Sequence, residues 1–266
     1  MTARVPFDDR RALQATILDL RETKAREFLH DIGSGLADEP DARTLYRNLR
    51  VAVPVNGHDA PKNVGLLFFS QDPEQWFPGC RIEIVRFADD ASGNIVDEQI
   101  ISKMPIHEQL RACLSYLENL TVWQTRKNPE KMEADRWISY PLPALREALV
   151  NAVYHRSYDS EPEPIKVRVY PDRMEIISYP GPVPGIEMEH FSGSLPLPPV
   201  PSRNRRIGEF LKELKLAEGK GTGLPKVRRA MQQNGSPPPI FDFDAQRSYF
   251  RVILPAHPEY KAMRGL

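Results

Sequence analysis

Cysteine is scarce in this chain, with two residues among 266. Cys80 and Cys113 are too few for a disulfide framework or a cysteine-based metal cluster. Acidic and basic residues are equal in number, at 36 each, so net charge does not indicate a nucleic-acid partner, although a local basic patch stays open. No apolar run approaches the ~20 residues that a membrane span requires. The first 30 residues carry charges where a signal peptide would have an apolar stretch, so we expect a cytoplasmic protein.

Proline, in contrast, is abundant, with 26 residues unevenly distributed. Its densest run lies at 195–201, where no regular helix or strand can persist. The chain length suits one or two domains, and Lys127–Glu130 has the composition of a boundary. We therefore predict a smaller α+β linking domain over 1–128 and a second domain over 129–266.

The first part of the chain mixes helical and strand patterns. Asp41 is placed to cap a helix through Leu45 and Leu49, and Asn56–Gly57 marks a turn. The apolar run Val64–Phe69 is too short to assign as a strand or a helix. The other elements that we predict here are helices over 10–20, 23–30 and 105–120, a strand over 81–87 and a turn at 92–94.

The second part follows the order helix, strand, strand, loop, helix, helix, strand, strand. Pro171–Asp172 is a turn that makes the first two strands a hairpin. Helices on one face of a mixed, largely antiparallel sheet are the natural packing for this order, which predicts an α+β fold whose C-terminal part is a two-layer α/β sandwich. The predicted helices cover 144–156, 205–216 and 224–234, and the predicted strands cover 165–170, 174–178, 240–243 and 249–254.

The helix over 144–156 separates polar from apolar side chains. At 100° per residue, Glu147, Asn151 and His155 fall within roughly 80° of each other. The small Ala144 and Ala148 beside them would leave room for a polar ligand. A solvated outer face is the alternative interpretation of this stripe, and the helix alone does not decide between them.

A glycine-rich segment precedes the helix over 224–234. Gly219, Gly221 and Gly223 alternate along it, so the backbone can approach an anion closely, and the N–H groups and positive dipole end of the following helix attract negative charge. Lys220 adds a cation. The spacing is neither that of a P-loop nor, without a βαβ unit around it, that of a dinucleotide fingerprint. A flexible turn between two helices is the alternative.

These motifs together resemble a known fold. The order Glu147-x3-Asn151, Tyr179–Pro182, a long loop and Gly219–Gly223 is similar to the Bergerat-type (GHKL) ATP-binding fold of gyrase, heat-shock chaperone, histidine kinase and mismatch-repair ATPases. A closer resemblance is to a divergent, RecG-related branch found in bacterial transcriptional regulators with a Schlafen/AlbA-like domain. It rests on 144–156, Asp172–Ile176 and Arg203-Asn204, and more weakly on Pro61–Phe69 through the 105–120 helix. The chain begins near Pro6–Arg10, which looks like the trailing edge of that domain without its core.

The resemblance implies a Mg-ATP site. Glu147 would be the catalytic residue that activates water, and Asn151 would coordinate Mg²⁺. The loop over 183–203 would close over the nucleotide as a lid. The other ATP-binding positions that the resemblance implies are His155, Ser178, Gly181, Gly219, Lys220, Gly221, Thr222 and Gly223.

One departure from the family pattern favours an alternative function. Ser178 stands where the better-known ATPases have an aspartate that receives the adenine amino group, and a neutral acceptor is weaker than an ionised one. The two functions that stay open are an ATP-binding, slowly hydrolysing regulator in transcription control or defence, and a non-enzymatic relative of that fold that acts through dimerisation or a partner.

Several charged residues have two interpretations. His155 is a phosphate contact or a cap of its own helix C-terminus. Arg203, Arg205 and Arg206 could contact phosphate of a nucleotide or of DNA, but arginines among acidic and basic neighbours more often form a solvated helix start. Arg156 is balanced between site and packing. The expected partners are a nucleotide and, left open, a second copy of the chain or nucleic acid, with no membrane.

Overall fold

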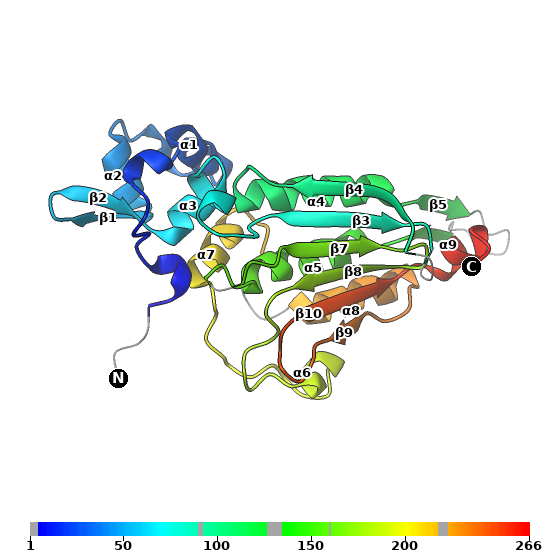
Figure 1. The fold of residues 1–266 in the computed structure, drawn as a ribbon. Helices are drawn as coiled ribbons and strands as arrows, with labels where there is room; N and C mark the ends of the chain where they lie inside the picture. Colours follow the sequence, from blue (N-terminus) through cyan, green and yellow to red (C-terminus); the bar gives the residue numbers. More distant parts are fainter. Residues whose placement is uncertain (1–4, 90–92, 127–134, 160, 218–222) are drawn as a thin grey trace.

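The computed structural model describes residues 5–89, 93–126, 135–159, 161–217 and 223–266. A mostly helical N-terminal module, residues 5–70, stands at one end of a longer sandwich (Figure 1). This module contains the single-turn 3-10 helices Phe7–Asp9, Ile17–Asp19 and Gly35–Asp38, the helices α1 (Glu22–Asp31), α2 (Ala42–Asn48) and α3 (Asn63–Phe69), and the hairpin of β1 (Ala52–Val55) and β2 (His58–Pro61).

The sandwich follows a short 3-10 helix at Pro73–Gln75. Its strands are β3 (Ile82–Phe87), β4 (Ile95–Ile101), β7 (Ile165–Val169), β8 (Arg173–Ser178), β9 (Ile240–Asp242) and β10 (Phe250–Pro255), and a separate hairpin is made by β5 (Trp123–Arg126) and β6 (Asp135–Ile138). The helices are α4 (Ile106–Leu120), α5 (Leu142–His155), α6 (Met188–Ser192), α7 (Arg205–Glu213), α8 (Gly223–Asn234) and α9 (Pro258–Met263).

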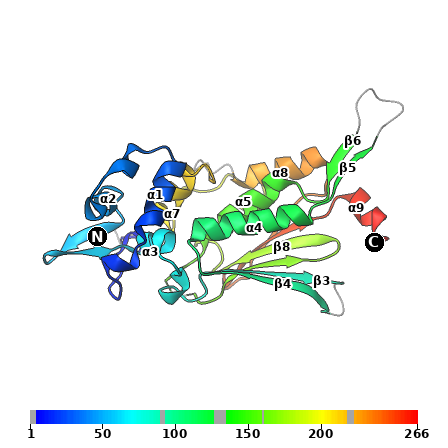
Figure 2. The ribbon, with the colours of Figure 1, turned by 90° about the horizontal axis from the view of Figure 1, so that it is seen from above.

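The sheet runs in the order β4-β3-β7-β8-β10-β9, and every pair is antiparallel except β3 with β7. Helices α4, α5 and α8 lie side by side on one face of it (Figure 2). Alternation along the strands explains the layers: Ile165 and Val167 of β7 are buried, whereas Lys166 between them is only half-buried. The predicted α+β sandwich with a mixed, largely antiparallel sheet is therefore confirmed.

The sheet takes strands from both sides of residue 128. Strands β3 and β4 precede that position and the other four follow it. The predicted boundary over 127–130 lies outside the described residues, and the division into 1–128 and 129–266 stays a prediction about folding units. No described helix has the length and apolarity that a bilayer crossing requires.

The predicted helix over 10–20 is wrong. Arg11 forms a β-bridge with Lys62, and the backbone N–H of Ala12 donates to the carbonyl of Pro61. These tertiary bonds hold Arg11 and Ala12 against the segment that precedes α3, and the helical part of 10–20 is limited to the single 3-10 turn Ile17–Asp19. The run Val64–Phe69, which sequence left unassigned, belongs to α3, whose residues are all buried. A helix that is buried on all sides has no alternation of apolar and polar residues, so its sequence does not show the helical period.

Helix α7 joins the N-terminal module to the sandwich. The Phe210 ring lies 5.0 Å from the rings of both Phe28 and Phe68. Arg206 donates to the carbonyl of Leu49 at 3.1 Å, and the backbone N–H of Ile207 donates to Oδ2 of Asp8 at 2.9 Å. Asp8, at the beginning of the chain, therefore satisfies an N–H group at the start of a helix about 200 residues later.

Asp8 makes stability depend on pH. Burial raises the pKa of its carboxyl, so the folded chain keeps this proton to a higher pH than the unfolded chain does. The free energy of unfolding should therefore fall as pH rises from the ordinary aspartate pKa of about 4 to the raised value.

Asp8→Asn keeps an oxygen for the Ile207 N–H and should flatten this slope, whereas Asp8→Ala leaves the N–H without its partner and should cost about 1–3 kcal/mol. Urea unfolding at several pH values between 4 and 8 measures both effects. An Asp8→Ala protein as stable as wild type at every pH would contradict this role.

Candidate functional site

Helices α5 and α8 lie next to each other, and their contact brings together three of the predicted site residues, Glu147, Asn151 and Gly223. Gly223 is the first residue of α8. A Cβ at this position would lie 3.1 Å from Nδ2 of Asn151 and well inside contact distance of Oε1 of Glu147. The last glycine of the predicted phosphate segment therefore lies directly against both side chains of the predicted ligand face.

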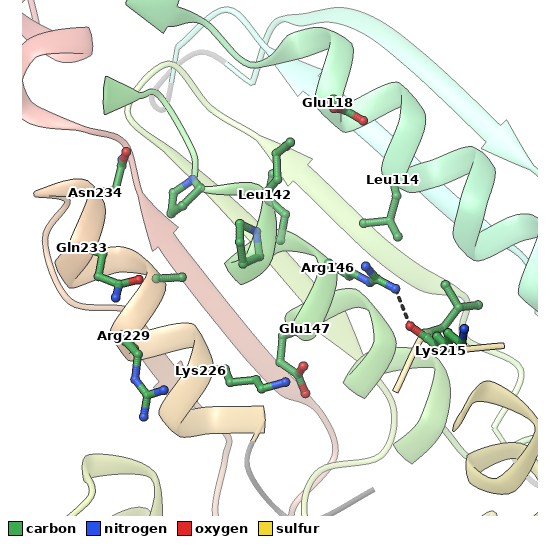
Figure 3. Close-up of a pocket in the computed structure, with 15 residues that line it drawn as sticks. Leu114, Glu118, Leu142, Arg146, Glu147, Lys215, Lys226, Arg229, Gln233 and Asn234 are labelled. Atoms are coloured by element: carbon green, nitrogen blue, oxygen red, sulfur yellow. Dashed lines mark hydrogen bonds between the residues drawn. The ribbon is translucent and has the colours of Figure 1, made fainter. Parts of the chain in front are cut away.

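Glu147 and Asn151 are both half-buried and lie one turn apart on α5. Nδ2 of Asn151 donates to Oε1 of Glu147 at 3.4 Å, which directs the amide oxygen away from the carboxylate. Lys226, one turn into α8, extends toward Glu147 (Figure 3). The site thus combines a carboxylate, an amide and an ammonium beside a helix N-terminus, the end of a helix that attracts anions.

The two alanines beside the polar stripe of α5 do not provide the space for a ligand that the sequence predicted. Ala144 and Ala148 are buried in the core, so they do not line open space beside the polar stripe. The apolar side of α5 behaves as its pattern predicts, since Leu145, Leu149 and Val153 are buried. Packing on that side fixes the backbone from which Glu147 and Asn151 project.

The C-terminus of α5 is capped by the two residues that precede α7. Asn204 Nδ2 donates to the carbonyls of Tyr154 at 2.8 Å and Arg156 at 2.7 Å, and Arg203 donates to the carbonyl of His155. The His155 side chain itself is exposed. Its predicted phosphate contact stays a prediction.

The three arginines that sequence left open as a phosphate contact or a solvated helix start do not form a surface patch. Arg203 is half-buried and also donates to the carbonyl of Gly181 at 3.2 Å, and burial lowers its pKa. Arg206 is buried and pairs with Glu209. Only Arg205 of the three is exposed. Helix capping and packing therefore occupy two of the three side chains proposed for nucleic-acid contact.

Arg156 is a packing residue. Its side chain is almost fully buried and donates to the carbonyls of Pro78, Glu161 and Glu163 at 3.0–3.2 Å. Its guanidinium also lies 4.8 Å from the centre of the Tyr158 ring.

Ser178 and Gly181 lie at the end of β8. Ser178 is buried and pairs with Phe250 in the ladder with β10. Gly181 donates its N–H to the carbonyl of Arg247 at 2.7 Å, and a Cβ there would lie 2.7 Å from the carbonyl oxygen of Tyr249. A close approach of two backbone segments therefore explains this glycine. Gly219, Lys220, Gly221 and Thr222 lie outside the described residues.

The segment over 183–203 contacts the far edge of the sheet, as Figure 1 shows for α6 beside β9. Phe191 of α6 is buried against Phe241 and Phe250, at ring distances of 6.0 and 4.9 Å. Arg247 donates to the carbonyl of Ile186 at 2.6 Å and to Glu187 at 2.7 Å. These contacts anchor the first half of the predicted lid.

Two residues of this region escaped the sequence analysis. Lys226 lies three positions after Gly223, so helical spacing from the glycine segment could have indicated it. Arg247 gave no signal, because its partners are mostly carbonyl groups about 60 residues away in sequence.

Metal binding at this site would depend on few protein ligands. Among the residues that the structure describes, no group of three or more His, Cys, Asp or Glu side chains could hold a metal ion. Mg²⁺ is often held by one or two protein oxygens together with substrate phosphates and water. The amide oxygen of Asn151 suits that arrangement.

Comparisons with known proteins agree with this architecture. A family model described as "Putative ATP-dependent DNA helicase recG C-terminal" matches residues 163–254, less than half of the chain, and supports an ATPase-like domain there. The crystal structure of the DIP2311 protein from Corynebacterium diphtheriae matches with a TM-score of 0.71 and 21% identity, over 96% of this chain and 49% of that one. At this identity the likeness shows the fold, and the chain spans about half the length of that protein. No curated protein matches the sequence.

Gly223 should be replaceable at little cost in stability. Glu147 Oε1 is the end of a flexible side chain and can move away from a new Cβ, whereas alanine favours the helix. We expect Gly223→Ala to change the free energy of unfolding by less than about 1 kcal/mol.

Gly208 provides the matched contrast, because a Cβ there would lie 2.5 Å from the Tyr154 ring. Gly208→Ala should cost about 1–3 kcal/mol. Gly35, with nothing within 4 Å of such a Cβ, gives the baseline. Denaturant unfolding of the three variants tests this order, and a Gly223→Ala variant less stable than Gly208→Ala would refute it.

Proposed function

We propose that this protein binds Mg-ATP at the junction of α5 and α8 and hydrolyses it slowly. The observation that supports the proposal best is the approach of Gly223 to Glu147 and Asn151. It joins a polar helix face to a helix N-terminus, two features that sequence placed more than 70 residues apart. The match of residues 163–254 to an ATPase-like family supports the same nucleotide chemistry.

The residues present fit a nucleotide with its metal. Because Gly223 has no side chain, a phosphate group can approach the first turn of α8, whose N–H groups point outward. Lys226 adds a positive charge on the next turn. Asn151 would hold Mg²⁺ through its amide oxygen, and the metal would neutralise phosphate charge once bound. His155, Ser178, Gly181 and residues 219–222 belong to the same proposed site.

Glu147 has the position of a general base. A carboxylate can accept a proton from a water molecule that attacks a phosphate group. Its Oε1 is held by Asn151, so the same amide that would hold the metal also orients the base. Half-burial limits the water around the carboxylate and strengthens its local electrostatic interactions.

A second function is favoured by Ser178. This neutral side chain stands where an ionised acceptor would hold the adenine amino group, so a relative without nucleotide binding would explain it. Such a protein would act as a regulator through a partner or a second copy of the chain. Nucleotide binding distinguishes the two functions.

Mg-ATP should raise the melting temperature of the wild type but not of Asn151→Ala. A ligand that binds only the folded state stabilises it by RT ln(1 + [L]/Kd), about 2.7 kcal/mol at 100 times Kd. Asn48→Ala, at the exposed end of α2, is a matched control that should keep the response. Thermal unfolding at millimolar Mg-ATP measures it, and no shift in the wild type would favour the second function.

Glu147→Gln should bind Mg-ATP and lose turnover. The amide keeps the size of the side chain but cannot take a proton from water, and loss of general base catalysis typically lowers rates about 10²–10⁴-fold. Phosphate release and nucleotide-induced thermal shift, measured on the same preparation, separate hydrolysis from binding. A variant that releases phosphate at the wild-type rate would exclude Glu147 as the base.

A further inference from the structure

A groove of about 900 Å³ lies over the first half of α5, between α4 and α8 (Figure 3). Glu147 and Lys226 mark one end of it, and Asn234 marks the other. Its length along α8, from residue 226 to residue 234, corresponds to about 12 Å of helix. The groove therefore extends well beyond the Glu147–Asn151 pair.

Seven of the fifteen residues that line the groove are apolar, and they come from three helices and from the segments before α5 and after α7. Leu114 comes from α4 and Leu216 from the chain that follows α7, both half-buried. The apolar lining residues are Leu114, Pro141, Leu142, Pro143, Leu145, Leu216 and Ala230. An apolar surface of this kind stabilises a partner that covers it with apolar side chains.

Basic residues outnumber acidic ones around this groove. Its four cations are Arg146, Lys215, Lys226 and Arg229, and its two carboxylates are Glu118 and Glu147. The whole chain has equal numbers of both signs, so this excess is local. Arg146 donates to the carbonyl of Lys215 at 2.5 Å, which fixes one corner of the rim. The charge pattern favours an acidic occupant.

Helical spacing indicates the shape of that occupant. Lys226, Arg229 and Gln233 follow one another at three- and four-residue intervals, so they form a row along α8 on one side of the groove (Figure 3). A helix lying between α4 and α8 would place its own side chains in the same intervals. Its apolar residues at i, i+3, i+4 and i+7 would fit over α5, and carboxylates on its flank would meet Lys226 and Arg229.

We infer that this groove is the docking site for an acidic amphipathic helix of a partner protein. The apolar residues of the lining supply contact area. Lys226 and Arg229 on α8 favour a helix with acidic flanks and orient it as it binds. This interaction does not require nucleotide, but the groove shares Glu147 and Lys226 with the nucleotide site proposed above.

Two libraries of 16-residue helical peptides test the inference. Both would carry varied apolar residues at i, i+3, i+4 and i+7, and their flanks would be either glutamate or lysine. The glutamate library should yield binders to the wild type, measured by fluorescence anisotropy. Arg229→Glu should weaken them at least tenfold and should bind lysine-flanked peptides better than the wild type does, because the side chain is exposed and belongs to the basic row.

Ala230→Trp fills the groove and should also abolish peptide binding, with circular dichroism checking that the variant folds. Arg43→Glu, an exposed arginine on α2, is the matched control and should bind as the wild type does. The inference is overturned if the glutamate library yields no binder, or if binding survives Arg229→Glu. Loss of Mg-ATP stabilisation in a folded Ala230→Trp would assign the groove to the nucleotide and also overturn it.

Discussion

The ends of two helices meet at Asn204, and the placement of the candidate site depends on how their backbone groups are satisfied. The last carbonyls of a helix and its first N–H groups have no partner within it. The Asn204 amide donates hydrogen bonds to carbonyls at the end of α5, and the Asp8 carboxylate accepts one from a backbone N–H at the start of α7. Breaking either contact would leave buried polar groups without partners, which costs more than an average hydrogen bond contributes. One junction therefore fixes α5, α7 and the beginning of the chain relative to one another.

A helix held in this way can present side chains at fixed positions. Its apolar side is buried from Ala144 to Val153, and its C-terminal carbonyls are bonded to Arg203 and Asn204. The freedom that remains to Glu147 and Asn151 is in their own side-chain torsions. Sites built on rigid elements keep their geometry better than sites built on loops. Gly223 completes the arrangement because α8 begins next to both side chains, and a side chain at this position would displace the Glu147 carboxylate.

Sequence alone predicted α5 and the hairpin of β7 and β8, because their patterns are local and periodic. It also placed Gly223 immediately before a helix. It could not predict that Arg206 is buried, since charge suggested a solvated helix start and the stabilising contact with Leu49 is 157 residues away. The helix over 10–20 failed for a similar reason, because bonds to Pro61 and Lys62 outweigh local helical preference. Contacts between distant segments thus determine what local patterns leave undecided.

The candidate site and the groove meet at Glu147 and Lys226, so a substitution at either residue cannot test one surface without affecting the other. Glu147 and Lys226 face each other across the contact of α5 with α8, so a change at either one alters both surfaces. Asn151 lies one turn beyond Glu147 on α5, and Arg229 lies one turn beyond Lys226 on α8. Because helical rise carries successive turns apart by about 5.4 Å, these two residues belong to different surfaces. Substitutions at Asn151 and Arg229 should therefore have additive effects if the surfaces act independently, and non-additive effects would reveal coupling through the helix pair.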